Sequence, residues 1–180
     1  MEGIGNLIGG IGVFFVGLHL LSTALKRRST PKAASWSAAP LSHNGLELLL
    51  ILQNKQKQLE AFEDLLLQFS LSCREWTGNL RSTFQGTFLQ GLDFLLHTAC
   101  EAENSDEATD AEQLVKLTQD KGDVFQSIRN AYLSGEKTMD TQDRTAFLEL
   151  TSLYERMIWT LGRIATLQLA QKRLAGVADG

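Results

Sequence analysis

The chain contains no proline after Pro40, although 140 residues follow that position. Proline interrupts helix interiors, so its absence over such a length favours long helices. The apolar residues of this stretch recur at intervals of three and four, which is the period of a helix and not that of a strand. We therefore predict an all-α fold for the larger part of the chain.

Two apolar seams in the first half of this stretch predict either one long helix or two helices with a bend or break near Thr77 and Gly78, and we favour the bend or break because an uninterrupted helix to Cys100 would be unusually long. Their members are Leu59, Phe62, Leu66, Phe69, Cys73, Trp76 and Leu80, followed by Phe84, Phe88, Leu92, Leu95 and Ala99. Aromatic residues at helical spacing are expected in the core, and this group comprises Trp76, Trp159, Phe84 and Phe88. The two cysteines, Cys73 and Cys100, are expected to be buried as small apolar side chains.

The second half predicts two more helices. One is expected to begin at a capping box made by Thr109 and Glu112 and to end near Gly135, with a buried face of Leu114, Leu117, Val124, Ile128 and Ala131. The last is expected to be capped by Asp140 or Thr141, with a seam that fades at Gln168 and consists of Phe147, Leu150, Tyr154, Met157, Leu161 and Ile164. Short connections predict an antiparallel three- to four-helix bundle.

A stretch without formal charge, residues 4–25, precedes the bundle. At about 1.5 Å rise per residue it matches a hydrocarbon core of about 30 Å, so we expect one transmembrane helix. Lys26, Arg27 and Arg28 follow at once, which places this flank in the cytoplasm and the N-terminus outside. The alternative is a helix buried within a soluble protein.

One face of this predicted membrane helix carries Gly5, Gly9, Gly12 and His19. Small residues at this spacing allow close helix packing, and a histidine within the membrane prefers a protein partner to lipid. We therefore expect the helix to pack against a second copy of the chain or against another membrane protein.

Charge and motif content exclude several classes of function. The net charge of −4 and the pI of about 5.4 argue against a dedicated nucleic-acid partner. The three histidines, His19, His43 and His97, lie far apart, and no nucleophile motif or phosphate-binding loop is present. We expect no enzymatic activity, no cofactor and no metal.

Two stretches carry a resemblance to one family. The N-terminal helix resembles the first membrane helix of bacterial sodium/phosphate cotransporters, GGxxxFxxGxxxxxxxLK, with matches at Gly9, Gly10, Phe14, Gly17, Leu25 and Lys26. The stretch "FLELTSLYERMIWTLGRIATL" is similar to the closing helix of the PhoU-like domain that these transporters carry at their cytoplasmic C-terminus.

This resemblance implies an organisation and a function. It implies a transmembrane helix over residues 1–28, a linker over 29–44 and a PhoU-like bundle over 45–175, anchored in a bacterial plasma membrane with the bundle in the cytoplasm. The chain lacks the QSS motifs of the family's transport core, so it is not expected to transport alone. The implied role is that of an accessory, regulatory or truncated member serving sodium-dependent phosphate transport. The alternative is a single-pass helical scaffold or sensor unrelated to phosphate.

PhoU-like domains also carry acidic metal-binding motifs, of which this chain keeps parts. In "QDKGD" Gln119 stands at the first acidic place, Asp123 remains, and Asp120 is out of register. In "ERMIW" the residues Glu155 and Arg156 remain, whereas Trp159 stands where an aspartate is expected. We therefore expect Asp120 and Asp123 on a solvated face, and Glu155 and Arg156 in ion pairs.

Overall fold

The computed structural model describes residues 43–76, 81–105, 107–119, 121–135 and 140–178. The predicted membrane helix, with Gly5, Gly9, Gly12 and His19, lies outside the described residues, as does Asp120. Among the helices that are described, none combines the length and the hydropathy that a membrane span requires.

The described chain is all-α. Its helices are α2 (His43–Glu75), α3 (Arg81–Asn104), α4 (Ala108–Thr118), α5 (Gly122–Gly135) and α6 (Thr141–Ala178), and the described residues contain no strand. Two compact units divide the chain, Met1–Leu52 and Gln53–Gly180. The second unit contains most of α2 and all of α3 to α6, and everything described below belongs to it.

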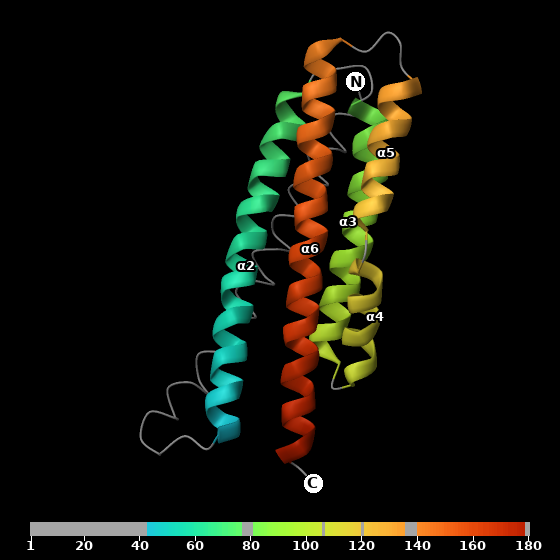
Figure 1. The fold of residues 1–180 in the computed structure, drawn as a ribbon. Helices are drawn as coiled ribbons and strands as arrows, with labels where there is room; N and C mark the ends of the chain where they lie inside the picture. The colour runs from blue at the N-terminus through green and yellow to red at the C-terminus, as the bar shows by residue number, and fades with distance from the viewer. Residues whose placement is uncertain (1–42, 77–80, 106, 120, 136–139, 179–180) are drawn as a thin grey trace. The chain divides into compact units, whose positions relative to one another are not determined.

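The helices of this unit run antiparallel (Figure 1). At the end of α2, Trp76 Nε1 donates a hydrogen bond of 2.6 Å to Asp143 Oδ1 at the start of α6. Near the other end, Lys55 Nζ lies 3.5 Å from Gln171 Oε1. Helix α3 runs back antiparallel to α2. Helix α4 packs against α3 and α6, and α5 continues from α4 along α6, so that α4 and α5 together form the third leg of the bundle, after α2 and α3.

Most of the predicted seams of α2, α3 and α6 are buried in the core, which confirms them for those members. Their buried members are Phe62, Leu66, Phe69, Cys73 and Trp76 on α2, Phe88, Leu92 and Leu95 on α3, and Phe147, Leu150, Tyr154, Met157, Leu161 and Ile164 on α6. Leu59 and Ala99 are only half-buried, and the side chains of Leu80 and Phe84 lie outside what the structure describes. The Tyr154 ring lies at the centre of an aromatic cluster, with centroid distances of 4.7 Å to Phe88, 5.7 Å to Phe125 and 6.1 Å to Phe69. The predicted break between α2 and α3 is also confirmed.

Small residues allow the closest helix approaches. Helices α4 and α6 come nearest to each other, with Ala111 and Ala165 fully buried. A Cβ added at Gly162 of α6 would lie 2.9 Å from Thr118 Oγ1 of α4, and one added at Gly91 of α3 would lie 2.7 Å from the Tyr154 hydroxyl oxygen. A side chain at either position would therefore require its neighbour to shift.

The third leg corrects the sequence prediction. Instead of one helix from a capping box at Thr109, the chain forms α4, whose N-cap is Glu107 without a side-chain cap, and a separate α5. The break shifts the helical phase, so Phe125 of α5 is buried, whereas Val124 is 50% exposed. Ala131 is likewise exposed and Ile128 is half-buried, so the predicted buried face is wrong beyond the break.

Helix α6 brings one confirmation and two corrections. Its N-cap is Asp140, whose Oδ1 accepts a hydrogen bond of 2.7 Å from the Asp143 amide. Trp159 is 60% exposed, so its expected place in the core is wrong. Gln168 is only 3% exposed, so the seam continues where it was expected to fade. Burial on α6 follows the side of the helix on which a residue lies and not its polarity. Trp159 lies on the side that faces outward, and Gln168 lies on the side that faces the core.

Candidate functional site

An ion pair joins α5 to α6 at the position of the predicted ERxxD stretch. Arg129 Nη2 donates to Glu155 Oε2 at 2.5 Å, and Arg129 Nε donates to Thr151 Oγ1 at 3.1 Å. The Arg129 side chain is 16% exposed and that of Glu155 35%. Glu155 was expected in an ion pair, either on the surface or between helices, and it forms one between α5 and α6 with a residue that the sequence did not single out.

The second oxygen of Glu155 lies beside the start of α5. A Cβ added at Gly122, the first residue of α5, would lie 3.9 Å from Glu155 Oε1. The N-terminus of a helix carries partial positive charge, so this end of α5 favours a carboxylate nearby. Glu155 thus faces Arg129 through one oxygen and the α5 N-terminus near the other.

The two partial acidic motifs therefore meet, because Gly122 directly precedes Asp123. Asp123 itself is exposed, as expected. Arg156 is exposed, and no ion pair joins it to another described residue. The ion pair expected for Arg156 is therefore not found among the described residues. Trp159 lies under the Arg163 guanidinium, 4.8 Å from its ring centroid, which is a cation–π contact.

This arrangement does not fit a multinuclear metal site. A bound cation would compete with the guanidinium of Arg129 for Glu155, and an arginine remains protonated at all ordinary pH values. Within the described residues, no three histidine, cysteine, aspartate or glutamate side chains gather closely enough to hold a metal ion. The described geometry instead uses Glu155 to hold α5 against α6.

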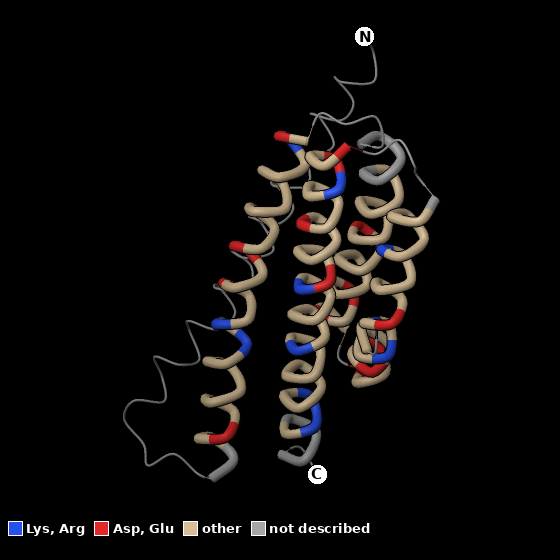
Figure 2. Tube along the Cα trace, turned by 45° about the horizontal axis from the view of Figure 1, so that its top comes forward, with Lys and Arg blue, Asp and Glu red and all other residues tan. Residues whose placement is uncertain are grey.

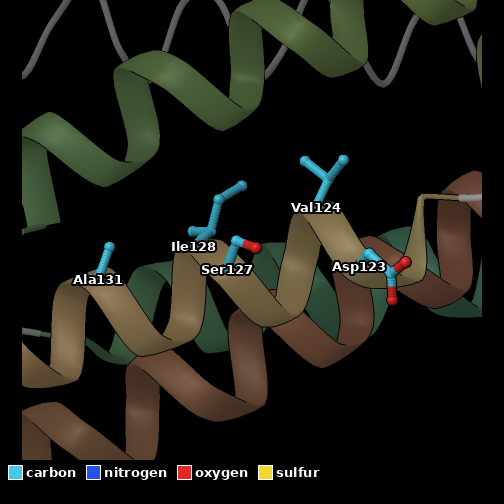
Figure 3. A pocket seen from close by; sticks show the side chains of 5 residues that line it. All are labelled: Asp123, Val124, Ser127, Ile128 and Ala131. Atoms are coloured by element: carbon cyan, nitrogen blue, oxygen red, sulfur yellow. The ribbon is translucent and has the colours of Figure 1, made fainter.

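An open groove of about 460 Å³ lies along the other side of α5 (Figure 3). It is lined by Asp123, Val124, Ser127, Ile128 and Ala131. The Val124 and Ile128 side chains point away from α6 and toward α3. The lining is mainly aliphatic, with the Ser127 hydroxyl along it and the Asp123 carboxylate at one end, which suits apolar contact.

A polar layer is buried between α2, α3 and α6. Lys55 is 5% exposed, and its Nζ lies 2.5 Å from Glu103 Oε2 and 3.5 Å from Gln171 Oε1. Gln168, one turn before Gln171, keeps its Nε2 buried, and no described residue lies within hydrogen-bond distance of it. A buried lysine requires a partner, and Glu103 supplies it from a position 48 residues away in the sequence.

Neither cysteine is placed for nucleophilic chemistry. Cys73 is buried as expected, whereas Cys100 is only half-buried. Burial, together with the negative charges of Glu101 and Glu103, raises the pKa of the Cys100 thiol. A raised pKa keeps this thiol protonated at neutral pH, and the thiolate is the reactive form.

Two of these residues were missed although the sequence carries a signal for them. Arg129 follows the buried Phe125 by four residues and precedes Tyr132 by three, so it lies on the inward stripe of α5. Lys55 precedes Leu59 by four residues and extends the seam of α2 in the same way. A charged residue at a seam position indicates a buried ion pair, but the spacing does not name the partner.

Comparison with known proteins identifies no relative. The chain matches no protein-family model, no curated protein and no solved structure. The family suggested by the N-terminal motif and the last helix therefore remains a prediction.

Proposed function

We propose that this protein is a membrane-anchored helical domain that serves sodium-dependent phosphate uptake as an accessory or regulatory component. The observation that carries the proposal is the N-terminal motif, with Gly9, Gly10, Phe14, Gly17, Leu25 and Lys26 at the spacing of the first cotransporter helix, followed in the same chain by a helical bundle. The apolar helix would anchor the chain and pack against a transporter, and the bundle would act on the cytoplasmic side.

The bundle has features that suit a protein-contact role. Helix α2 exposes Leu67 (53%) and Leu71 (39%) on its outward face, one turn apart. Trp159 is exposed on α6, and exposed tryptophan is enriched at protein interfaces. The ion pair of Glu155 with Arg129 holds α5 against α6. These features support a domain that works through contacts with other proteins.

The test is a crosslinked pull-down of the tagged full chain from native membranes, in phosphate-rich and phosphate-starved cells. We expect recovery of a phosphate transporter that is lost in Gly9→Leu, because leucine blocks the close approach that glycine allows. Gly10→Leu is the matched control, since Gly10 lies beside Gly9 but off the predicted packing face. Transporter recovery that is equal in both variants would contradict a packing role for this face.

A second candidate is a single-pass scaffold or sensor unrelated to phosphate. The Arg129–Glu155 pair favours it, because the acidic position that the family would give to a metal is neutralised within the chain. The same pull-down separates the two candidates. Recovery of the chain alone, unchanged by phosphate, would overturn the phosphate proposal and favour the scaffold.

A further inference from the structure

Lys172 of α6 makes an unusual set of contacts with the corner between α3 and α4. Its Nζ donates to three backbone carbonyl oxygens, those of Ala102, Ser105 and Glu107, each at 2.7 Å. An ammonium group has three N–H donors and no more. Every donor of Lys172 therefore has a carbonyl partner, and all three carbonyls converge on one point.

The backbone explains why these oxygens are available. Helix α3 ends at Asn104, so the carbonyls of its last turn, including that of Ala102, lack partners within the helix. Ser105 belongs to the connection that precedes α4, and Glu107 is the N-cap of that helix. The carbonyl oxygen of an N-cap residue accepts the first bond of its helix and has a second lone pair, which can accept from Lys172. The partial negative charge at the C-terminus of α3 also favours a cation here.

We propose that the α3–α4 corner is a carbonyl site for a primary ammonium ion, which Lys172 fills from within the chain. The chemical class of its ligand follows from the geometry. A compact tetrahedral –NH3⁺ can direct three donors at three converging oxygens, whereas the planar guanidinium of arginine spreads its donors over a wider fork. Lys172 thus fastens the C-terminal part of α6 to the corner, and a free alkylammonium ion would take its place if the side chain were removed.

The neighbouring Arg173 provides a matched contrast. Its Nη2 lies 3.1 Å from Glu112 Oε1 of α4, and the two side chains are 65% and 42% exposed. Figure 2 shows that basic positions gather along the C-terminal half of α6. The two adjacent cations therefore have different partners. Lys172 is surrounded by backbone carbonyl oxygens, whereas Arg173 makes an exposed ion pair that has little effect on stability.

The test is chemical rescue of Lys172→Ala in the full chain, held in mild detergent. This substitution removes three carbons and the nitrogen, which is the n-propylammonium skeleton. We expect the melting temperature to fall by about 5–10 °C, given the charge-assisted hydrogen bonds that are lost. Added n-propylammonium chloride should raise it again, whereas choline chloride and sodium chloride at the same ionic strength should not.

Three variants complete the design. Lys172→Met should lose stability without rescue, because its side chain fills the space that propylammonium would enter, and Lys172→Arg should not restore the wild-type melting temperature. Arg173→Ala should lose much less and show no rescue. The proposal would be overturned if Lys172→Ala were as stable as Arg173→Ala, or if all three salts acted equally on Lys172→Ala.

Reductive methylation of the unaltered chain tests the proposal without any variant. Mass spectrometry would follow the modification of each lysine with time. Lys172 should react many-fold more slowly than Lys57 and Lys116, which are exposed on α2 and α4. If Lys172 were methylated as fast as Lys116, its ammonium would not be enclosed by the three carbonyls, and the proposal would fail.

Discussion

Helices α4 and α5 form two halves of one leg of the bundle, yet they are attached to it in different ways. Helix α4 buries Ala111, Leu114 and Thr118 and lies close against α6. Helix α5 buries Phe125 alone among its residues 122–134, and it is otherwise held by the Arg129–Glu155 pair and by the stacking of Tyr132 on Phe147, with ring centroids 4.6 Å apart.

This difference shows what apolar periodicity can and cannot predict. The spacing of Leu114, Val124 and Ile128 places them on one face only if the helix is continuous. The break between α4 and α5 changes the phase, so Leu114 faces the core while Val124 faces the groove. Helices α4 and α6 bury small residues, Ala111 and Ala165, where they meet, whereas the small residues Ser127 and Ala131 of α5 are exposed.

The largest expected effect is a loss of stability on removal of a buried side chain from α4, the closely packed half of this leg. Leu114→Ala should lower the free energy of unfolding by about 3 kcal/mol, because Leu114 is fully buried and a cavity would remain. Val124→Ala, on the half-exposed face of α5, should change it by less than about 0.5 kcal/mol. Chemical denaturation followed by circular dichroism measures both. Equal losses would show that α5 is covered in solution by something that the described chain does not supply.

The next effect concerns the tether of α5. Arg129→Met should cost about 2 kcal/mol, a value between those of exposed and buried ion pairs, because the two side chains are only partly buried. Hydrogen exchange should show that the loss of protection is concentrated in α5 and spares α4. The control is Arg156→Met, since Arg156 is exposed and makes no ion pair with a described residue. Uniform deprotection of both helices would contradict a local tether.

Two glycine substitutions test how closely the backbones of α4 and α5 approach α6. Gly162→Ala should cost about 1 kcal/mol net, since its Cβ would meet Thr118 Oγ1 at 2.9 Å and Thr118 Cβ at 3.3 Å. Gly122→Ala should be tolerated, because the nearest atom, Glu155 Oε1, lies 3.9 Å away. Thr118→Ala should reduce the cost of Gly162→Ala in a double-mutant cycle, and strict additivity would argue against the contact.

The smallest effect appears only at alkaline pH. Burial raises the pKa of Tyr154 from 10.0 to about 12. The stability that Tyr154 contributes is fully present below pH 10 and is lost as the pH rises toward 12, because ionisation is easier in the unfolded chain. The loss amounts to about 1 kcal/mol at pH 11. Tyr154→Phe should flatten this part of the pH profile of stability. An unchanged slope would assign the alkaline loss to other groups.

The sequence predicted most of the fold and part of the candidate site. The seams of α2, α3 and α6, the break before α3, the end of α5 at Gly135 and the Asp140 cap follow from local chemistry, and the structure contains them. Glu155 was expected in an ion pair, and it forms one. Arg129, Lys55 and Lys172 were not predicted as partners, because each contacts residues that are distant in the sequence.

The sequence by itself determined that this chain is helical and which stripe of each long helix is apolar, since the helical period acts over a few neighbouring residues. Only the tertiary structure decided which face of α5 is buried, and that Gln168 is buried whereas Trp159 is exposed. It also decided which residues pair with Lys55 and Glu155. The physical reason is range. Helical periodicity and capping are local, whereas burial and ion pairing depend on segments brought together across the whole bundle.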